Sequence, residues 1–145
     1  MKRNWYKFRV KYSKEMDDGK RKKVSEEYLV DAASFTETEK RAHKAATDLI
    51  GTRDFDITAI SREPVSDIIK GTEAEENHWY KAVVALVTED DETGQKKFSP
   101  QIMYVNAEDT KEADVLLRER MEDSQVDWEI KSIAETKVLG VLEYK

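Results

Sequence analysis

The stretch DWEIKSIAET at residues 127–136 has an earlier counterpart in the same chain, DFDITAISRE at residues 54–63. In both stretches an aromatic residue stands second, and isoleucines stand fourth and seventh. The alternation of apolar and polar residues predicts a half-buried β-strand. It loses its phase just before the second isoleucine in each copy, which predicts a β-bulge in both strands. Two matching stretches so far apart indicate that the chain contains a duplication.

The match continues towards the N-terminus of each half. Trp5 begins the sequence WYK, which recurs at Trp79, so the register stays within a residue or two over two consecutive stretches. We therefore divide the chain into two internal repeats, residues 1–72 and residues 73–145. Because a unit of about seventy residues buries too little surface to be stable by a wide margin, residues 1–145 are expected to form a single domain around one shared core.

Each repeat shows the signals of two strands, a helix and a third strand. In the first repeat, residues 5–13 alternate between apolar and basic side chains, and Gly19 supplies a turn into a second strand at about residues 21–30. Ser34 followed three residues later by Glu37 predicts the N-terminus of a helix, because the two side chains can satisfy free backbone N–H groups.

The second repeat carries the same signals, with Asp109 and Glu112 as the predicted helix cap. Residues 81–87 are apolar at nearly every position, which predicts a central strand covered on both faces. Short strands at residues 65–69 and 138–144 close the two repeats. We predict an α+β fold of two tandem ββαβ(β) repeats with pseudo-two-fold symmetry, forming a mostly antiparallel sheet with two packed helices.

Composition narrows the class of protein. Charged residues make up 39% of the chain, there is no cysteine, and neither a membrane span nor an apolar secretory segment is visible. We expect a soluble cytoplasmic protein. The net charge of −6 conceals an asymmetry, because residues 1–70 hold 16 Lys/Arg against 13 Asp/Glu, and residues 71–145 hold 9 against 18. Such polarity favours head-to-tail association or an anionic ligand at the basic end, while net acidity argues against general nucleic-acid binding.

Several blocks of sequence stand out together: KKV at residues 22–24, YLVDA at residues 28–32 with SFTE at residues 34–37, WYK at residues 79–81, and EI at residues 129–130 with SIAET at residues 132–136. With these blocks the chain resembles an uncharacterised domain-of-unknown-function family found in Bacteroidetes bacteria and their phages or mobile elements. The likeness spans nearly the full chain and implies a bacterial or phage cytoplasm. It transfers no catalytic or binding residue, because no activity is established for that family.

The basic N-terminal hairpin is the first candidate binding site. Basic groups beside aromatic rings can pair with phosphates and stack on bases, so one alternative is a nucleic-acid-associated accessory protein. The aromatic residues mostly share the opposite face of the strand, however, which favours a solvated basic face. The basic residues of the hairpin are Lys2, Arg3, Lys7, Arg9, Lys11, Lys14, Lys20, Arg21, Lys22 and Lys23.

Acidic pairs in the two matching strands raise a remote alternative, a metal-dependent hydrolase. In the second copy Glu129 and Lys131 match the end of a nuclease motif in which acids hold Mg²⁺ and a lysine orients water. The first copy has Thr58 in place of the lysine, which favours two amphipathic strands without a metal. His43 and His78 lack a spaced second ligand and are expected at the surface. We predict no catalytic residue, no metal and no cofactor.

Trp5 and Trp79 occupy matching positions at the start of each repeat's first strand. Aromatic residues related by a pseudo-axis can line a pocket at the seam between repeats or anchor a subunit interface, although they can also simply pack in a core. The leading hypothesis is a non-enzymatic binding or regulatory protein that acts through this seam or through an oligomer interface. Its expected partner is a protein, a small ligand or a second copy of the chain, and not a membrane.

Overall fold

A computed structural model describes residues 4–51, 54–71, 74 and 77–144. Lys2 and Arg3 of the basic hairpin lie outside these residues. The chain forms two compact units. Unit 1 consists of Met1–Pro64 with Lys137–Lys145, and unit 2 consists of Val65–Thr136. No helix among the described residues is long and apolar enough to cross a membrane.

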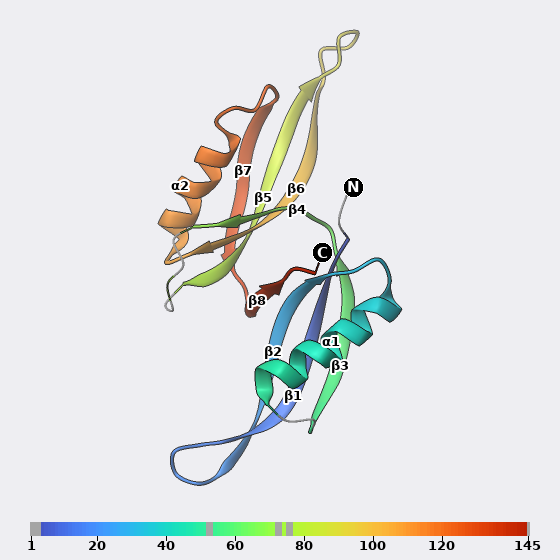
Figure 1. Ribbon diagram of the computed structural model, residues 1–145. Coiled ribbons are helices and arrows are strands. Elements are labelled where there is room, and N and C mark those ends of the chain that lie inside the picture. Colours follow the sequence, from blue (N-terminus) through green and yellow to red (C-terminus); the bar gives the residue numbers. More distant parts are fainter. Residues whose placement is uncertain (1–3, 52–53, 72–73, 75–76, 145) are drawn as a thin grey trace. The chain divides into compact units, whose positions relative to one another are not determined.

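Unit 1 is a four-stranded sheet with one helix against it (Figure 1). Strand β1 pairs antiparallel with both β2 and β3, whereas β8 is parallel to β2, so the sheet is mixed in the order β3-β1-β2-β8. The elements are β1 (Trp5–Glu15), β2 (Arg21–Asp31), α1 (Phe35–Ile50), β3 (Phe55–Glu63) and β8 (Val138–Leu142).

Unit 2 has the same arrangement. Strand β5 pairs antiparallel with β6 and β7, and β4 is parallel to β6, which gives the order β4-β6-β5-β7. The inner position of β5 confirms the central strand predicted for residues 81–87. The elements are β4 (Val65–Lys70), β5 (His78–Glu89), β6 (Lys96–Ala107), α2 (Thr110–Met121) and β7 (Asp127–Glu135).

The predicted α+β class is confirmed, with eight strands and two helices in the described part of the chain. The strands form two mixed sheets where we expected one mostly antiparallel sheet. The two short strands also change places: β4 follows β3 in the chain but joins the sheet of unit 2, and β8 follows β7 but joins the sheet of unit 1. Each unit therefore receives its fourth strand from the other half of the sequence.

Both helices begin at the predicted caps. The Ser34 hydroxyl accepts a hydrogen bond from the backbone N–H of Glu37 at 3.1 Å, and the Asp109 carboxylate accepts one from Glu112 at 2.8 Å. Each cap satisfies a donor that the first turn of a helix leaves free. Helix α1 ends at Gly51, whose φ of 78° suits glycine because a side chain would be strained there.

The β-bulges predicted for the two matching stretches are present in β3 and β7. Between Arg9 and Val10 of β1 the register of β3 skips Thr58, and between Val83 and Val84 of β5 the register of β7 skips Lys131. Each extra residue lies just ahead of the break in the alternating pattern. The bulges leave the second isoleucine of each strand packed against the helix-side core.

Each unit has its own hydrophobic core between sheet and helix. In unit 1, alternate residues of β1 and β2 pack against the alanines of α1; in unit 2, alternate residues of β5 and β6 pack against α2. The core of unit 1 includes Tyr6, Phe8, Val10, Tyr28, Val30, Ala42 and Ala46, and that of unit 2 includes Tyr80, Ala82, Val84, Val105, Ala113 and Leu117.

Candidate binding surfaces

The basic face of β1 lies on the side of the sheet away from α1. Tyr6, Phe8 and Val10 point into the helix-side core, so the alternate residues Lys7, Arg9 and Lys11 point the other way. Acidic neighbours offset part of this charge. The Arg9 guanidinium contacts the Glu27 carboxylate at 2.8 Å, and Lys7 Nζ lies 4.0 Å from a Glu63 oxygen.

The aromatic residues of the hairpin are engaged in the core. Tyr6 meets Phe35 edge to face, with ring centroids 5.0 Å apart, and Phe8 stacks on Tyr28 at 5.6 Å. These rings lie on the opposite side of the sheet from Lys7, Arg9 and Lys11. Trp5 shares the side of the basic residues by alternation but is only 6% exposed, so the basic face of β1 offers little aromatic surface on which bases could stack.

The remaining basic candidates lie at the far end of the hairpin. Arg21, Lys22 and Lys23 are exposed residues at the start of β2. Lys22 stands directly opposite Lys14 of β1 in the ladder. Like charges in this position destabilise a pair of strands. This concentration of positive charge therefore does nothing for the stability of the hairpin.

Trp5 and Trp79 open β1 and β5 at corresponding places, as the repeat predicted, and both indoles are buried, with 6% and 8% of their surface exposed. The carbonyl oxygen of Trp79 accepts hydrogen bonds from both the backbone and the hydroxyl of Thr136. A role for either tryptophan in recognition stays a prediction.

The strand acids do not gather into a site. Glu129 pairs with Lys131 at 3.1 Å, and His78 Nδ1 lies 3.1 Å from a Glu135 oxygen, both at the surface. Among the described residues, no three acidic, histidine or cysteine side chains come together in a group that could hold a metal ion.

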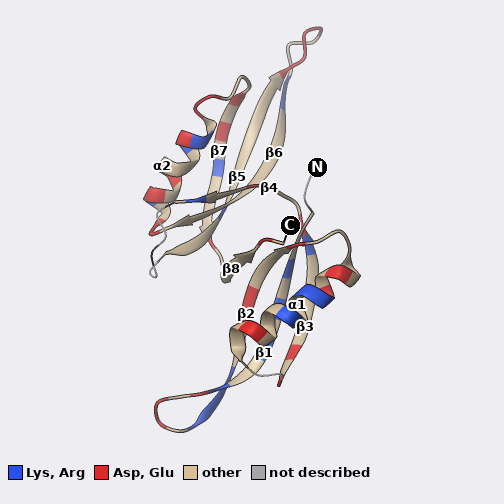
Figure 2. Cartoon of the chain, in the orientation of Figure 1, with Lys and Arg blue, Asp and Glu red and all other residues tan. Residues whose placement is uncertain are grey.

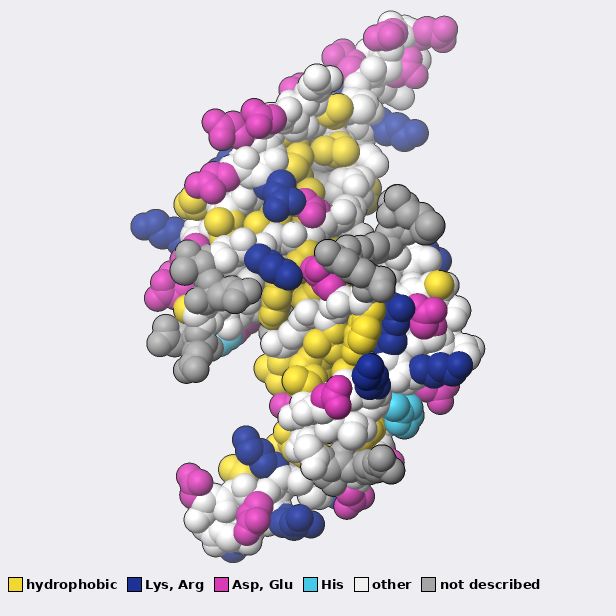
Figure 3. All heavy atoms as spheres, in the orientation of Figure 1, with side chains coloured by type: hydrophobic (Ala, Val, Ile, Leu, Met, Phe, Trp, Pro, Cys, Tyr) yellow, Lys and Arg dark blue, Asp and Glu magenta, His cyan; other side chains and the backbone are white. Residues whose placement is uncertain are grey.

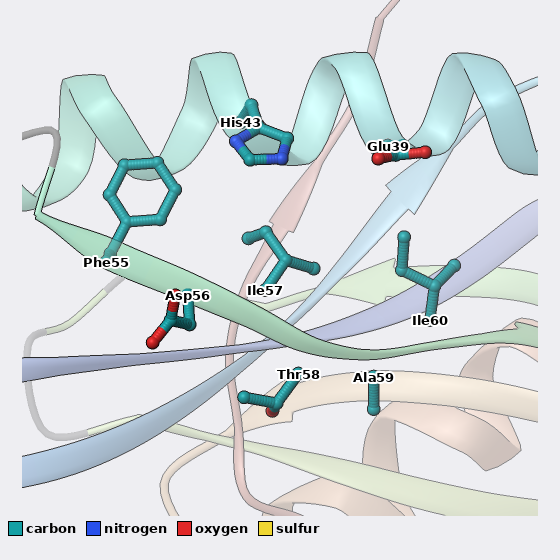
Figure 4. A pocket seen from close by; sticks show the side chains of 8 residues that line it. All are labelled: Glu39, His43, Phe55, Asp56, Ile57, Thr58, Ala59 and Ile60. Carbon is teal, nitrogen blue, oxygen red and sulfur yellow. The ribbon is translucent and has the colours of Figure 1, made fainter.

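A hollow of about 510 Å³ lies between α1 and β3 of unit 1. Phe55, Ile57 and Ile60 point from the strand towards the helix, and His43 and Glu39 of the helix lie above them (Figure 4). The His43 ring is tilted over the Phe55 ring, with centroids 5.7 Å apart. We name this hollow the α1/β3 groove, with an apolar floor and polar rim.

Unit 2 has a hollow of about 560 Å³ in the corresponding place, between α2 and β7. The Arg118 guanidinium lies 5.9 Å from the centre of the Trp128 ring. Its Nε donates a hydrogen bond of 3.0 Å to the Asp114 carboxylate, which holds the guanidinium in place. Val115 lies beside them and is 49% exposed. We name this hollow the α2/β7 groove.

The two grooves share one matching pair of a helix residue and a strand aromatic residue, and their other lining residues differ. Phe55 and Trp128 are both the second residue of the matching stretches, and both stand under a helix side chain, His43 or Arg118, that points at the ring. From the sequence we expect His43 at the surface, and no motif points to Arg118. Aligning the two helices from their caps would have placed both residues nine positions after the cap, each above the aromatic residue of the next strand.

Comparison with known proteins places the chain in a family but gives it no function. The family described as Domain of unknown function (DUF4494) matches residues 4–144. No curated protein and no solved structure matches the chain.

Proposed function

The chain belongs to the DUF4494 family of unknown function, and we propose that it is a non-catalytic protein that binds a partner segment in the α1/β3 groove. The observation that carries this proposal is the recurrence of the groove in both units, with an aromatic floor residue under a helix side chain each time.

The lining of the groove indicates the kind of segment that fits. Its volume of about 510 Å³ is within the range of about 300–1,000 Å³ usual for ligand sites. The floor is apolar, and the charged residues that line it, Glu39 and Asp56, are both acidic. We therefore propose a peptide segment with one apolar side chain for the floor and a neighbouring lysine or arginine for the rim.

The position of β3 in the sheet supports binding of an extended segment. In the described part of the chain β3 is an edge strand, because it pairs with β1 on one side only. An edge offers backbone groups to a bound peptide. The bulge at Thr58 interrupts that edge and limits pairing to a few residues. Side-chain contacts in the α1/β3 groove would then determine which peptide binds, more than backbone pairing along β3 would.

Peptide selection tests this proposal. A displayed library of short peptides is selected against the full chain, and the affinity of the recovered sequences is measured by calorimetry. We expect apolar residues flanked by Lys or Arg, and a loss of up to about fivefold in affinity for Glu39→Lys, since a contact between exposed charges is worth about 0.2–1 kcal/mol. Lys44→Ala, an exposed change on the same helix outside the groove, is the matched control.

Selected peptides whose affinity is the same for Glu39→Lys and the wild type would contradict the proposal. Chemical-shift changes on peptide addition give an independent check, because they should centre on His43 and β3.

We also propose, from the sequence resemblance, that family members act in the cytoplasm of Bacteroidetes bacteria or their phages and mobile elements. The distribution of the sequence blocks among genomes tests this. The shared order of elements, caps and bulges supports the further proposal that the two units descend from one duplicated unit. An experimental structure in which the two units do not superpose would contradict it.

A further inference from the structure

The distribution of charge between the two units is very uneven. Unit 1 holds 17 Lys/Arg against 13 Asp/Glu, and unit 2 holds 8 against 18. Much of the positive charge is on the β1–β2 hairpin, and acidic residues mark α2 and the start of β7 (Figure 2). Opposite fields of this kind bring surfaces together in solution, and they do so most strongly at low salt.

The end of the β1–β2 hairpin is a basic knob with a defined shape. Its turn is closed by a 2.8 Å hydrogen bond from Met16 N–H to the Lys20 carbonyl and by Gly19 at a φ of 80°. Met16 is 41% exposed at this turn. Residues 14–23 at this end of the hairpin also hold Glu15, Asp17 and Asp18, so five Lys/Arg against three Asp/Glu leave a net charge of +2. Within the described ranges none of the five cations forms an ion pair. They are Lys14, Lys20, Arg21, Lys22 and Lys23.

The α2/β7 groove of unit 2 has the complementary character. Its apolar part consists of the half-buried Trp128 and the exposed Val115. Other hydrophobic side chains also reach the surface of both units (Figure 3). Glu119 and Glu122 line the groove. Asp123 and Asp127 follow in the turn and at the start of β7.

Charge pairing within unit 2 leaves these acids available. Arg118, the one cation among the groove's lining residues, is held by Asp114. In the part of the chain that the structure describes, Glu119, Glu122, Asp123 and Asp127 form no ion pair. Four acids without ion pairs around an apolar groove thus complement a hairpin end that has a net positive charge and an exposed methionine.

We propose that the α2/β7 groove binds the β1–β2 hairpin of a second copy of this chain. Met16 of one copy lies against Trp128 and Val115 of the other, and the lysines of the hairpin pair with Glu119 and Glu122. The cross-strand pair of Lys14 and Lys22, which costs stability in the isolated hairpin, is then compensated at the contact. The proposal goes beyond the function proposed for the α1/β3 groove, because it concerns another groove and another partner.

The contact is small, so the association is weak and sensitive to salt. Sedimentation velocity of the full chain is expected to show an average mass that rises with concentration at 50 mM NaCl. The association constant should fall on the order of tenfold at 500 mM NaCl, because exposed ion pairs are screened. A wild-type chain that stays monomeric at low salt up to millimolar concentration would overturn the proposal.

Charge reversal gives the sharper test. The hairpin variant Lys22→Glu/Lys23→Glu and the groove variant Glu119→Lys/Glu122→Lys should each lose self-association, because each then presents like charges on both surfaces. An equal mixture of the two variants should associate again, since the acidic hairpin of one matches the basic groove of the other. The control Lys40→Glu/Lys44→Glu reverses two exposed charges on α1 outside both grooves and should associate as the wild type does.

The remaining outcomes separate this proposal from its alternatives. Unchanged association in the reversed variants, or a mixture that stays monomeric, would overturn it. A third outcome would also overturn it: the wild type shows no self-association but binds a single-stranded oligonucleotide, and the hairpin variant loses that binding. The hairpin would then bind nucleic acid. Glu39→Lys in the α1/β3 groove should leave self-association intact. Failure of the self-association proposal therefore does not affect the peptide-binding function, and failure of the peptide-binding function does not affect self-association.

Discussion

The backbone N–H of Tyr144 donates a hydrogen bond of 2.5 Å to the carboxylate of Asp31, which is buried at the end of β2. Arg41 of α1 binds the Asp31 carbonyl and lies over the Tyr144 ring at 4.9 Å from its centre. Asp31 therefore joins the strand that precedes the helix, the helix itself and the segment after β8. This contact ties the last residues of the chain into unit 1.

We predict that Asp31→Ala lowers the free energy of unfolding by about 1–3 kcal/mol, because it leaves the Tyr144 N–H without its acceptor and removes the carboxylate that lies 3.9 Å from Arg41. Asp31→Asn should cost less, since the amide oxygen can still accept from Tyr144. Urea unfolding followed by circular dichroism measures both. The exposed Asp48→Ala on α1 is the control and should stay within about 0.5 kcal/mol of the wild type. An Asp31→Ala variant as stable as the control would show that the contact contributes nothing.

The exchange of β4 and β8 predicts which fragments fold. Fragment 65–136 contains β4, β5, β6, α2 and β7, which are all the elements of unit 2, whereas the repeat-based fragment 73–145 lacks β4. Ile69 of β4 is part of the unit 2 core, with 4% of its surface exposed. We expect a cooperative thermal transition for 65–136, and little or none for 73–145, although the two are of nearly equal length. Equal melting behaviour of the two fragments would contradict the assigned strand order.

Local features of this fold could be predicted from the sequence, because their causes lie within a few residues. The caps at Ser34 and Asp109 need only a side chain and the next turn of backbone. The alternation in β1 needs only a core on one side of the strand. The bulges follow from a break in alternation that each strand carries in its own sequence.

The partners of β4 and β8 could not be predicted in the same way. Val65, Ile68 and Ile69 have the same spacing as Val138, Val141 and Leu142, so either segment suits the edge of either sheet. Parallel pairing also depends on how the chain crosses between sheets, for which the pattern of apolar residues holds no signal. The grooves were missed for a related reason, because each one joins a helix residue to a strand residue about ten positions away.

A pair of leucines tests the core of unit 2. Leu117 of α2 is fully buried among the strands, and Leu139 of β8 is 58% exposed. We predict that Leu117→Ala costs about 2–5 kcal/mol through lost burial and the cavity that remains. The same substitution at Leu139 should cost within about 0.5 kcal/mol. Chemical unfolding of both variants checks this, and a Leu139→Ala variant that is the less stable of the two would mean that β8 packs differently.

The last prediction concerns alkaline pH. Burial of the Tyr28 phenol, together with nearby Glu26 and Tyr12, raises the pKa of Tyr28 from 10.0 to about 12, and its hydroxyl donates a 3.4 Å hydrogen bond to Glu26. Because the folded state holds the neutral phenol more tightly than the unfolded chain does, this contribution to stability is complete below about pH 10. It is lost as the pH rises from about 10 to about 12.

The wild type should therefore lose stability more steeply over that range than Tyr28→Phe, which has no proton to release. Subtracting the two urea-unfolding curves removes the ionisation of lysines, which both proteins share. Parallel curves for the wild type and Tyr28→Phe from pH 9 to pH 12 would show that the phenol ionises equally readily in the folded and unfolded states.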